Sequence, residues 1–149
     1  MKTINEMEIS FKAISINEGF ARACVAAFCV QANPSVDEIT DIKTAVSEAV
    51  TNAVVHAYPL GDGMITIKVK LYATGAVIEV ADQGIGIDDF EKAKEPFYTT
   101  KPNEERSGMG FTVMESFMDS VTLSKNGKCG VLVKMEKIFK KAESNAVGI

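Results

Sequence analysis

The feature that most constrains the fold is an amphipathic stretch that runs from Ser35 to Tyr58. Ser35 and Glu38 form the capping-box pattern that begins helices, and a Pro-Leu-Gly-Asp-Gly turn follows Tyr58. Since an α-helix turns about 100° per residue, the apolar side chains of this stretch fall on one side. They are Ile39, Ile42, Val46, Val50, Ala53 and Ala57. So long an apolar stripe needs a second layer of secondary structure to cover it.

Shorter helix and strand patterns surround this stretch. Alternating apolar and polar residues predict strands, and helical apolar spacing predicts two further helices. In chain order the expected elements are strand 7–16, helix Asn17–Gln31 with Asn17 as its N-cap, helix Ser35–Tyr58, strands 64–73 and 76–81, helix Gly110–Met118, and strands Ser120–Ser124 and Cys129–Ile138. This order predicts the α+β class, a two-layer sandwich with helices on one face of a mixed, mostly antiparallel sheet.

Composition limits the chemistry and the partners. The 149 residues include 16 basic and 20 acidic side chains, for a formal net charge of −4, and no long run of Lys or Arg. We therefore expect neither nucleic acid nor an anionic membrane as a direct partner. A single histidine excludes a three-histidine zinc site. The length suits one domain, residues 1–149, with its core over 7–140 and a loose C-terminal tail.

Cysteine usage and the N-terminal sequence indicate a compartment. Three cysteines, with no Cys-x-x-Cys spacing, are typical of thiols in a reducing environment, and Cys24 and Cys29 lie in an apolar stretch. The longest apolar run, Ala23–Val30, is too short to span a bilayer, and the N-terminus does not resemble a signal peptide. These features predict a cytoplasmic protein.

A polar column lies opposite the apolar stripe of the 35–58 helix. Glu48, Asn52 and His56 are spaced four residues apart and stack along one helix face. A solvated face would account for them, and a structural role is the simplest interpretation of His56. However, Ala45 and Ala49 flank Glu48 and leave room for a ligand. A carboxylate and a carboxamide in one column can serve as a base and a metal ligand.

Two glycine-containing segments carry a second and a third signal. Asp82 begins an Asp-x-Gly-x-Gly turn after a strand, where the carboxylate could accept a hydrogen bond from an exocyclic amine. Arg106-Ser-Gly-Met-Gly110 opens a helix, where backbone amides and a guanidinium make an anion site. Each segment alone also fits an ordinary turn or a hinge. The long loop over 95–110 is of a kind that is often functional, and no P-loop is present.

Three motifs follow one another along the chain: Glu-x-x-x-Asn on a helix, Asp-x-Gly-x-Gly after a strand and Ser-Gly-Met-Gly at a helix start. In this order they resemble the N box and two glycine boxes of the GHKL, or Bergerat-type, ATP-binding class. Within that class, Glu48–Tyr58 and Phe97–Glu115 look like the bacterial anti-sigma factor serine kinases, chiefly the sporulation branch, with the stress-response anti-sigma-B kinases as near relatives. The resemblance covers residues 7–140. It implies the two-layer α/β sandwich of the GHKL class, with ATP and Mg²⁺ as cofactors.

The resemblance also implies roles for single residues. Glu48 would be the general base and Arg106 a second catalytic residue, and Asn52 would ligate Mg²⁺. Asp82 would accept the adenine amine. The implied nucleotide contacts are Asn52, Asp82, Gly84, Gly86, Thr99, Thr100, Lys101, Ser107, Gly108, Met109 and Gly110. Relatives often carry a hydroxyl pair in the last hairpin, where this chain has Lys128-Cys129-Gly130.

The implied partners are a sporulation-type sigma factor, which is sequestered, and an anti-anti-sigma protein, which is phosphorylated on serine. A homodimer is implied too, and Arg22 matches a partner-contact position of the family. Three other classes share the ATP-binding motifs or part of them. A sensor histidine kinase holds its phosphorylated histidine in a preceding helical hairpin, and a gyrase-like ATPase adds a transducer domain. A nucleotide-dependent binding module without phosphotransfer is the third alternative, although Glu48 argues against it.

Overall fold

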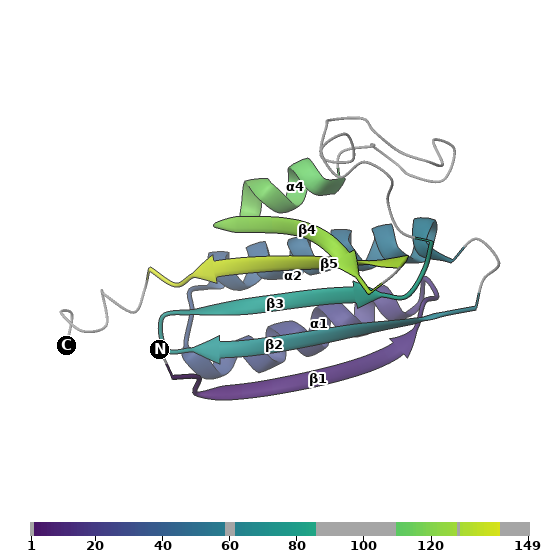
Figure 1. The fold of residues 1–149 in the computed structure, drawn as a ribbon. Coiled ribbons are helices and arrows are strands. Elements are labelled where there is room, and N and C mark those ends of the chain that lie inside the picture. The colour runs from purple at the N-terminus through teal and green to yellow at the C-terminus, as the bar shows by residue number, and fades with distance from the viewer. Residues whose placement is uncertain (1, 59–61, 86–109, 128, 141–149) are drawn as a thin grey trace, which may run out of the picture.

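In a computed structural model of the chain, residues 2–58, 62–85, 110–127 and 129–140 are described. Within these ranges, helices cover one face of a five-stranded sheet (Figure 1). The elements are β1 (Asn5–Lys12), α1 (Asn17–Cys29), η1 (Val30–Ala32), α2 (Val36–Asn52), η2 (Ala53–Ala57), β2 (Met64–Tyr72), β3 (Gly75–Asp82), α4 (Gly110–Phe117), β4 (Ser120–Asn126) and β5 (Cys129–Ile138).

The sheet has the strand order β1-β2-β3-β5-β4, and every neighbouring pair is antiparallel. The predicted α+β sandwich is therefore confirmed, while the parallel component allowed for by a mixed sheet is not found in the described ranges. Short hairpins join β2 to β3 and β4 to β5, which requires antiparallel pairing. None of the helices in those ranges combines the length and the apolar composition that crossing a bilayer needs.

The core lies between the sheet and the helix layer, and α2 packs against both α1 and α4. The predicted stripe of α2 is buried, with Ile39 packed partly buried at its edge. Alternate residues of the strands face this stripe, as a half-buried sheet requires. The largest fully buried side chains are Ile42, Ile65, Ile67, Leu71, Ile78, Met114, Met135, Val25, Val46, Val50, Val69 and Cys29. The burial of Cys29 raises the pKa of its thiol to about 12, so this cysteine stays protonated.

The start of α1 differs from the prediction. The N-cap residue is Ile16, which makes no side-chain capping hydrogen bond, so the assignment of Asn17 as N-cap was wrong. The Asn17 Nδ2 atom instead donates to the carbonyl oxygen of Lys12 at 2.9 Å. The side chain therefore ties the helix start to the end of β1. Of the two cysteines in the apolar stretch, Cys29 is buried and Cys24 only half-buried.

The capping box of α2 is present as predicted. The Ser35 amide donates to Glu38 Oε1 at 2.8 Å, and the Glu38 amide donates to Ser35 Oγ at 3.1 Å. Glu38 is only 9% exposed, because its Oε2 accepts the Lys140 amide at 2.7 Å. Burial acts to raise the pKa of Glu38, but the hydrogen bonds from Ser35 and Lys140 outweigh it and lower that pKa.

Replacing Glu38 by alanine should therefore lower the free energy of unfolding by about 1–2 kcal/mol, the usual cost of losing a helix cap. Because the pKa of Glu38 is lower in the folded state, its carboxylate stabilises the fold at pH values above its ordinary pKa of 4.5. This contribution to stability is lost as the pH falls below that value. Urea denaturation at neutral and progressively lower pH measures both effects. Asp37→Ala is the matched control, since Asp37 is an exposed carboxylate of the same turn. Equal losses in the two variants would contradict the prediction.

Candidate functional site

The predicted polar column begins in the last turns of α2. Glu48 and Asn52 lie one turn apart and are both half-buried. The helix then continues from Ala53 to Ala57 as a π-helix, so the expected helix has the right extent but the wrong form over its last five residues. A π-helical turn holds more residues than an α-turn, so His56 does not continue the column in register. Such segments are frequent at functional sites.

The Asn52 carboxamide fits the role of a metal ligand. Its Nδ2 atom is buried and makes no hydrogen bond within the described ranges, so that nitrogen does not hold the fold together. Its oxygen is a hard donor of the kind that Mg²⁺ prefers. In the described part of the chain, no group of three or more His, Cys, Asp or Glu side chains could hold a metal. A Mg²⁺ ion here would therefore depend on Asn52 together with oxygens from phosphate and water.

Asp82 is the last residue of β3 and one of the most buried polar residues, at 6% exposed. Its Oδ1 atom accepts two backbone amides, from Gly84 at 2.9 Å and from Val131 at 3.2 Å. These two bonds fix the carboxylate, and because no residue in the described ranges donates to its other oxygen, that oxygen can serve as the acceptor for a ligand. Burial raises the pKa of Asp82 above its ordinary value of 3.8, against the opposing effect of the two amides.

The turn after Asp82 packs on the end of the π-helix. The Ile85 amide donates to the Ala57 carbonyl oxygen at 2.9 Å, and a Cβ atom on Gly84 would overlap that same oxygen. Only glycine fits this close approach. Figure 1 shows η2, the end of β3 and the start of β5 at one end of the molecule. The structure therefore brings the helix of Glu48 and Asn52 and the turn of Asp82 into contact.

The last hairpin supports Asp82 from the other side, which the sequence did not indicate. Asn126 Nδ2 donates to the Asp82 carbonyl oxygen at 2.8 Å, and the Gly130 amide donates to the Gly84 carbonyl oxygen at 3.0 Å. Gly130 has a φ of 40°, and a Cβ atom there would overlap the Asp82 carbonyl oxygen. The sequence indicated only a pair of strands about the Lys125-Asn126-Gly127-Lys128 segment.

The remaining predicted site residues fall in two groups. Gly110 is the first residue of α4, as expected for a helix start. Arg22 lies on α1, where its Nη1 atom is 3.5 Å from Glu18 Oε2 and its side chain is 43% exposed. It does not contact the Asp82 turn through any hydrogen bond or ion pair in the described ranges. The residues that lie outside those ranges are Gly86, Thr99, Thr100, Lys101, Arg106, Ser107, Gly108 and Met109.

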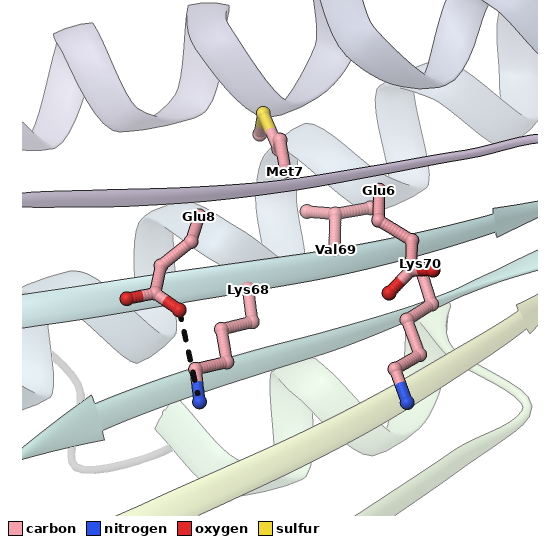
Figure 2. A pocket seen from close by; sticks show the side chains of 6 residues that line it. All are labelled: Glu6, Met7, Glu8, Lys68, Val69 and Lys70. Carbon is pink, nitrogen blue, oxygen red and sulfur yellow. Dashed lines mark ion pairs between the residues drawn. The ribbon is translucent and has the colours of Figure 1, made fainter.

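A shallow hollow of about 390 Å³ lies elsewhere, over β1 and β2 (Figure 2). Glu8 and Lys68 form an exposed ion pair across these strands, at 3.7 Å. Exposed ion pairs of this kind contribute little to stability. Because the charges of the two side chains cancel, the hollow has no net attraction for phosphate. Glu8, Lys68 and Lys70 point away from the helix layer in Figure 2, whereas Met7 points toward it. The hollow is therefore on the face of the sheet opposite α2 and is not part of this site.

The sequence has close relatives of known name. Residues 14–137 match the family described as Histidine kinase-like ATPase domain. The Anti-sigma F factor of Thermoanaerobacter sp. (strain X514) is 51% identical over 137 residues, which are 92% of this chain and 96% of that protein. Those of Bacillus velezensis and Bacillus subtilis (strain 168) are 48% and 46% identical over 141 residues, 94% of this chain and 97% of each relative.

Two solved structures share the fold at low identity. The RsbU and RsbW domains of Rv1364c from Mycobacterium tuberculosis match with a TM-score of 0.64 and 18% identity, over 90% of this chain and 32% of that chain. The catalytic domain of the histidine kinase ThkA matches with a TM-score of 0.56 and 17% identity, over 89% and 97%. Sequence and fold agree, and the chain belongs to the anti-sigma F factor family, within the histidine kinase-like ATPase domains.

Proposed function

We propose that this protein is an ATP-dependent serine-protein kinase that also binds and inhibits a sporulation sigma factor, and that its phosphorylation substrate is a serine of an anti-anti-sigma protein. Family membership supports the class of activity. The observation that carries the proposal is the contact between two elements. Ala57 is the last residue of η2, which continues the helix of Glu48 and Asn52, and its carbonyl oxygen accepts the Ile85 amide from the turn that begins at Asp82. One nucleotide could then contact both elements.

Each residue of the site has a proposed role that follows from its chemistry. Asp82 offers an oriented carboxylate oxygen to the amine of adenine, while Gly84 keeps the turn close to the helix. Asn52 holds Mg²⁺, which when bound with ATP supplies charge neutralisation for the phosphates. Glu48, one turn before Asn52, accepts the proton of the substrate serine, since a serine hydroxyl is a weak nucleophile at neutral pH. Arg106 is proposed as a second catalytic residue.

The other nucleotide contacts are proposals from the family resemblance. They are Gly86, Thr99, Thr100, Lys101, Ser107, Gly108, Met109 and Gly110. Gly110 starts α4, and amides at a helix start attract phosphate. We further propose that the chain is a single cytoplasmic domain that acts as a homodimer and binds neither nucleic acid nor a membrane directly.

The test is incubation of the protein with radiolabelled ATP, Mg²⁺ and a candidate anti-anti-sigma protein, followed by phosphoamino-acid analysis. Labelled phosphoserine on the added protein is the expected result. Label on histidine of the chain itself would favour a histidine kinase. Binding of ATP without any transfer, together with capture of a sigma factor, would favour a nucleotide-dependent binding module.

Arg22 gives a separate test of the partner surface. Arg22→Ala should weaken capture of the sigma factor by about 5- to 10-fold, the effect of losing one good interface arginine, and leave ATP affinity unchanged. Arg22 lies on α1, whereas the Asp82 turn packs on η2 and β5. Lys43→Ala is the matched control, since Lys43 is an exposed cation on α2. Normal capture by Arg22→Ala in a pull-down would refute the assignment.

A further inference from the structure

Tyr58 follows the π-helix directly and joins three segments through its hydroxyl. Its Oη atom accepts the Gln83 amide at 2.7 Å and donates to the Met64 carbonyl oxygen at 2.7 Å. Gln83 is the residue after Asp82, and Met64 is the first residue of β2. One hydroxyl therefore connects the end of the Glu48–Asn52 helix to both strands at the site.

The position of this hydroxyl follows from the register of the sheet. Ile65 of β2 pairs with Asp82 of β3, and this is the last pair of their ladder. The next pair would be Met64 with Gln83, and there the Tyr58 hydroxyl stands between the two backbones. The hydroxyl thus takes the place of one backbone pair, and the pairing of β2 with β3 ends at Asp82.

The tyrosine ring has space prepared for it. A Cβ atom on Gly63 would overlap the ring of Tyr58. The ring therefore occupies the space that a side chain at position 63 would fill. The Gly63 carbonyl oxygen in turn accepts the amide of Ala13 at 2.9 Å, which anchors this segment to the end of β1. The ring is also packed partly buried against the core. The phenol is therefore held at both its ring and its hydroxyl.

We infer that Tyr58 is a positioning residue for nucleotide recognition: its hydroxyl sets the orientation of the Asp82 carboxylate relative to the helix of Glu48 and Asn52. The inference rests on the proposed function, because it concerns how Asp82 reads the adenine amine. Asp82 is fixed by Gly84 and Val131 through its side chain, and Tyr58 fixes the backbone immediately after it. Loss of the hydroxyl frees that backbone without removing any group that contacts nucleotide.

The test is Tyr58→Phe, which keeps the ring and removes the hydroxyl. Affinity for Mg-ATP, measured by calorimetry, should fall by about 3- to 10-fold, the effect of one lost hydrogen bond. Affinity for Mg-ITP, which lacks the 6-amino group, should change little, so discrimination between ATP and ITP shrinks. The KM for ATP in phosphotransfer should rise, with kcat retained. The Gln83 amide of the nucleotide-free variant should exchange with solvent faster than in the wild type.

Tyr72→Phe is the matched control. Tyr72 is the last residue of β2, at the end of that strand opposite to Met64, and its hydroxyl has no interaction within the described ranges. It should leave both affinities and the Gln83 exchange unchanged. If the ratio of ATP affinity to ITP affinity is the same in Tyr58→Phe as in the wild type, whether neither affinity falls or both fall equally, the inference is overturned. Failure of the wild type to bind ATP at all would instead overturn the proposed function.

Discussion

Glu48→Gln is expected to lower the rate of single-turnover phosphotransfer by about 10²- to 10⁴-fold, the usual contribution of a general base. Glutamine has nearly the same shape as glutamate but cannot accept the serine proton at neutral pH. Binding of Mg-ATP should be retained, because Glu48 is not among the proposed contacts of the nucleotide. Rapid-quench measurement of transfer to the anti-anti-sigma protein, beside calorimetry of Mg-ATP binding, separates the two effects.

The matched control is Glu8→Gln, since Glu8 is an exposed carboxylate on the outer face of the sheet, paired with Lys68. It should leave both transfer and binding unchanged. Unchanged transfer in Glu48→Gln would remove Glu48 as the base. An equal loss of transfer and of ATP affinity would instead assign Glu48 to nucleotide binding.

The local features of the fold could be predicted from the sequence because their signals lie within a few residues. The capping box of Ser35 and Glu38 and the buried stripe of α2 were predicted correctly. Alternation likewise predicted the strands 64–73 and 76–81, which form the antiparallel pair β2 and β3. Asn17 was assigned wrongly as a cap, because its side chain is instead held at the end of β1, where its Nδ2 atom donates to an acceptor there, the Lys12 carbonyl oxygen. That acceptor is available only once the turn after β1 has formed.

The environment of the site depends on contacts far apart in the chain, which periodicity does not encode. Asp82 was predicted from its motif, but the amide of Val131 that orients it lies 49 positions away. The burial of Glu38 likewise depends on the amide of Lys140, 102 positions away. The π-helix was missed for another reason, since Ala53 and Ala57 fit the apolar stripe of an ordinary α-helix equally well. Only the structure shows where the chain departs from that period.

Asp82→Asn is expected to weaken Mg-ATP binding by roughly 10- to 100-fold, the effect of about 1.5–3 kcal/mol for a hydrogen bond to a charged group. The amides of Gly84 and Val131 both point at Oδ1 and require an acceptor there. Asparagine can supply that acceptor only by turning its NH₂ group toward the nucleotide, where a donor would meet the donating adenine amine. The reverse orientation would place the NH₂ group against the two amides, so either orientation loses a bond.

The same substitution should not destabilise the nucleotide-free protein. Because burial raises the pKa of Asp82, the folded state binds a proton more tightly than the unfolded state, so the contribution of this group to stability is lost as the pH rises above 3.8. A neutral asparagine avoids that loss, so the unfolding temperature at neutral pH should be equal to or above that of the wild type. Asp119→Asn is the matched control, since Asp119 Oδ2 also accepts a backbone amide, from Ile138 at 2.6 Å. Calorimetry with ATP and ITP, beside thermal unfolding, checks both parts. Unchanged ATP affinity, or equal losses for ATP and ITP, would show that Asp82 does not read the amine.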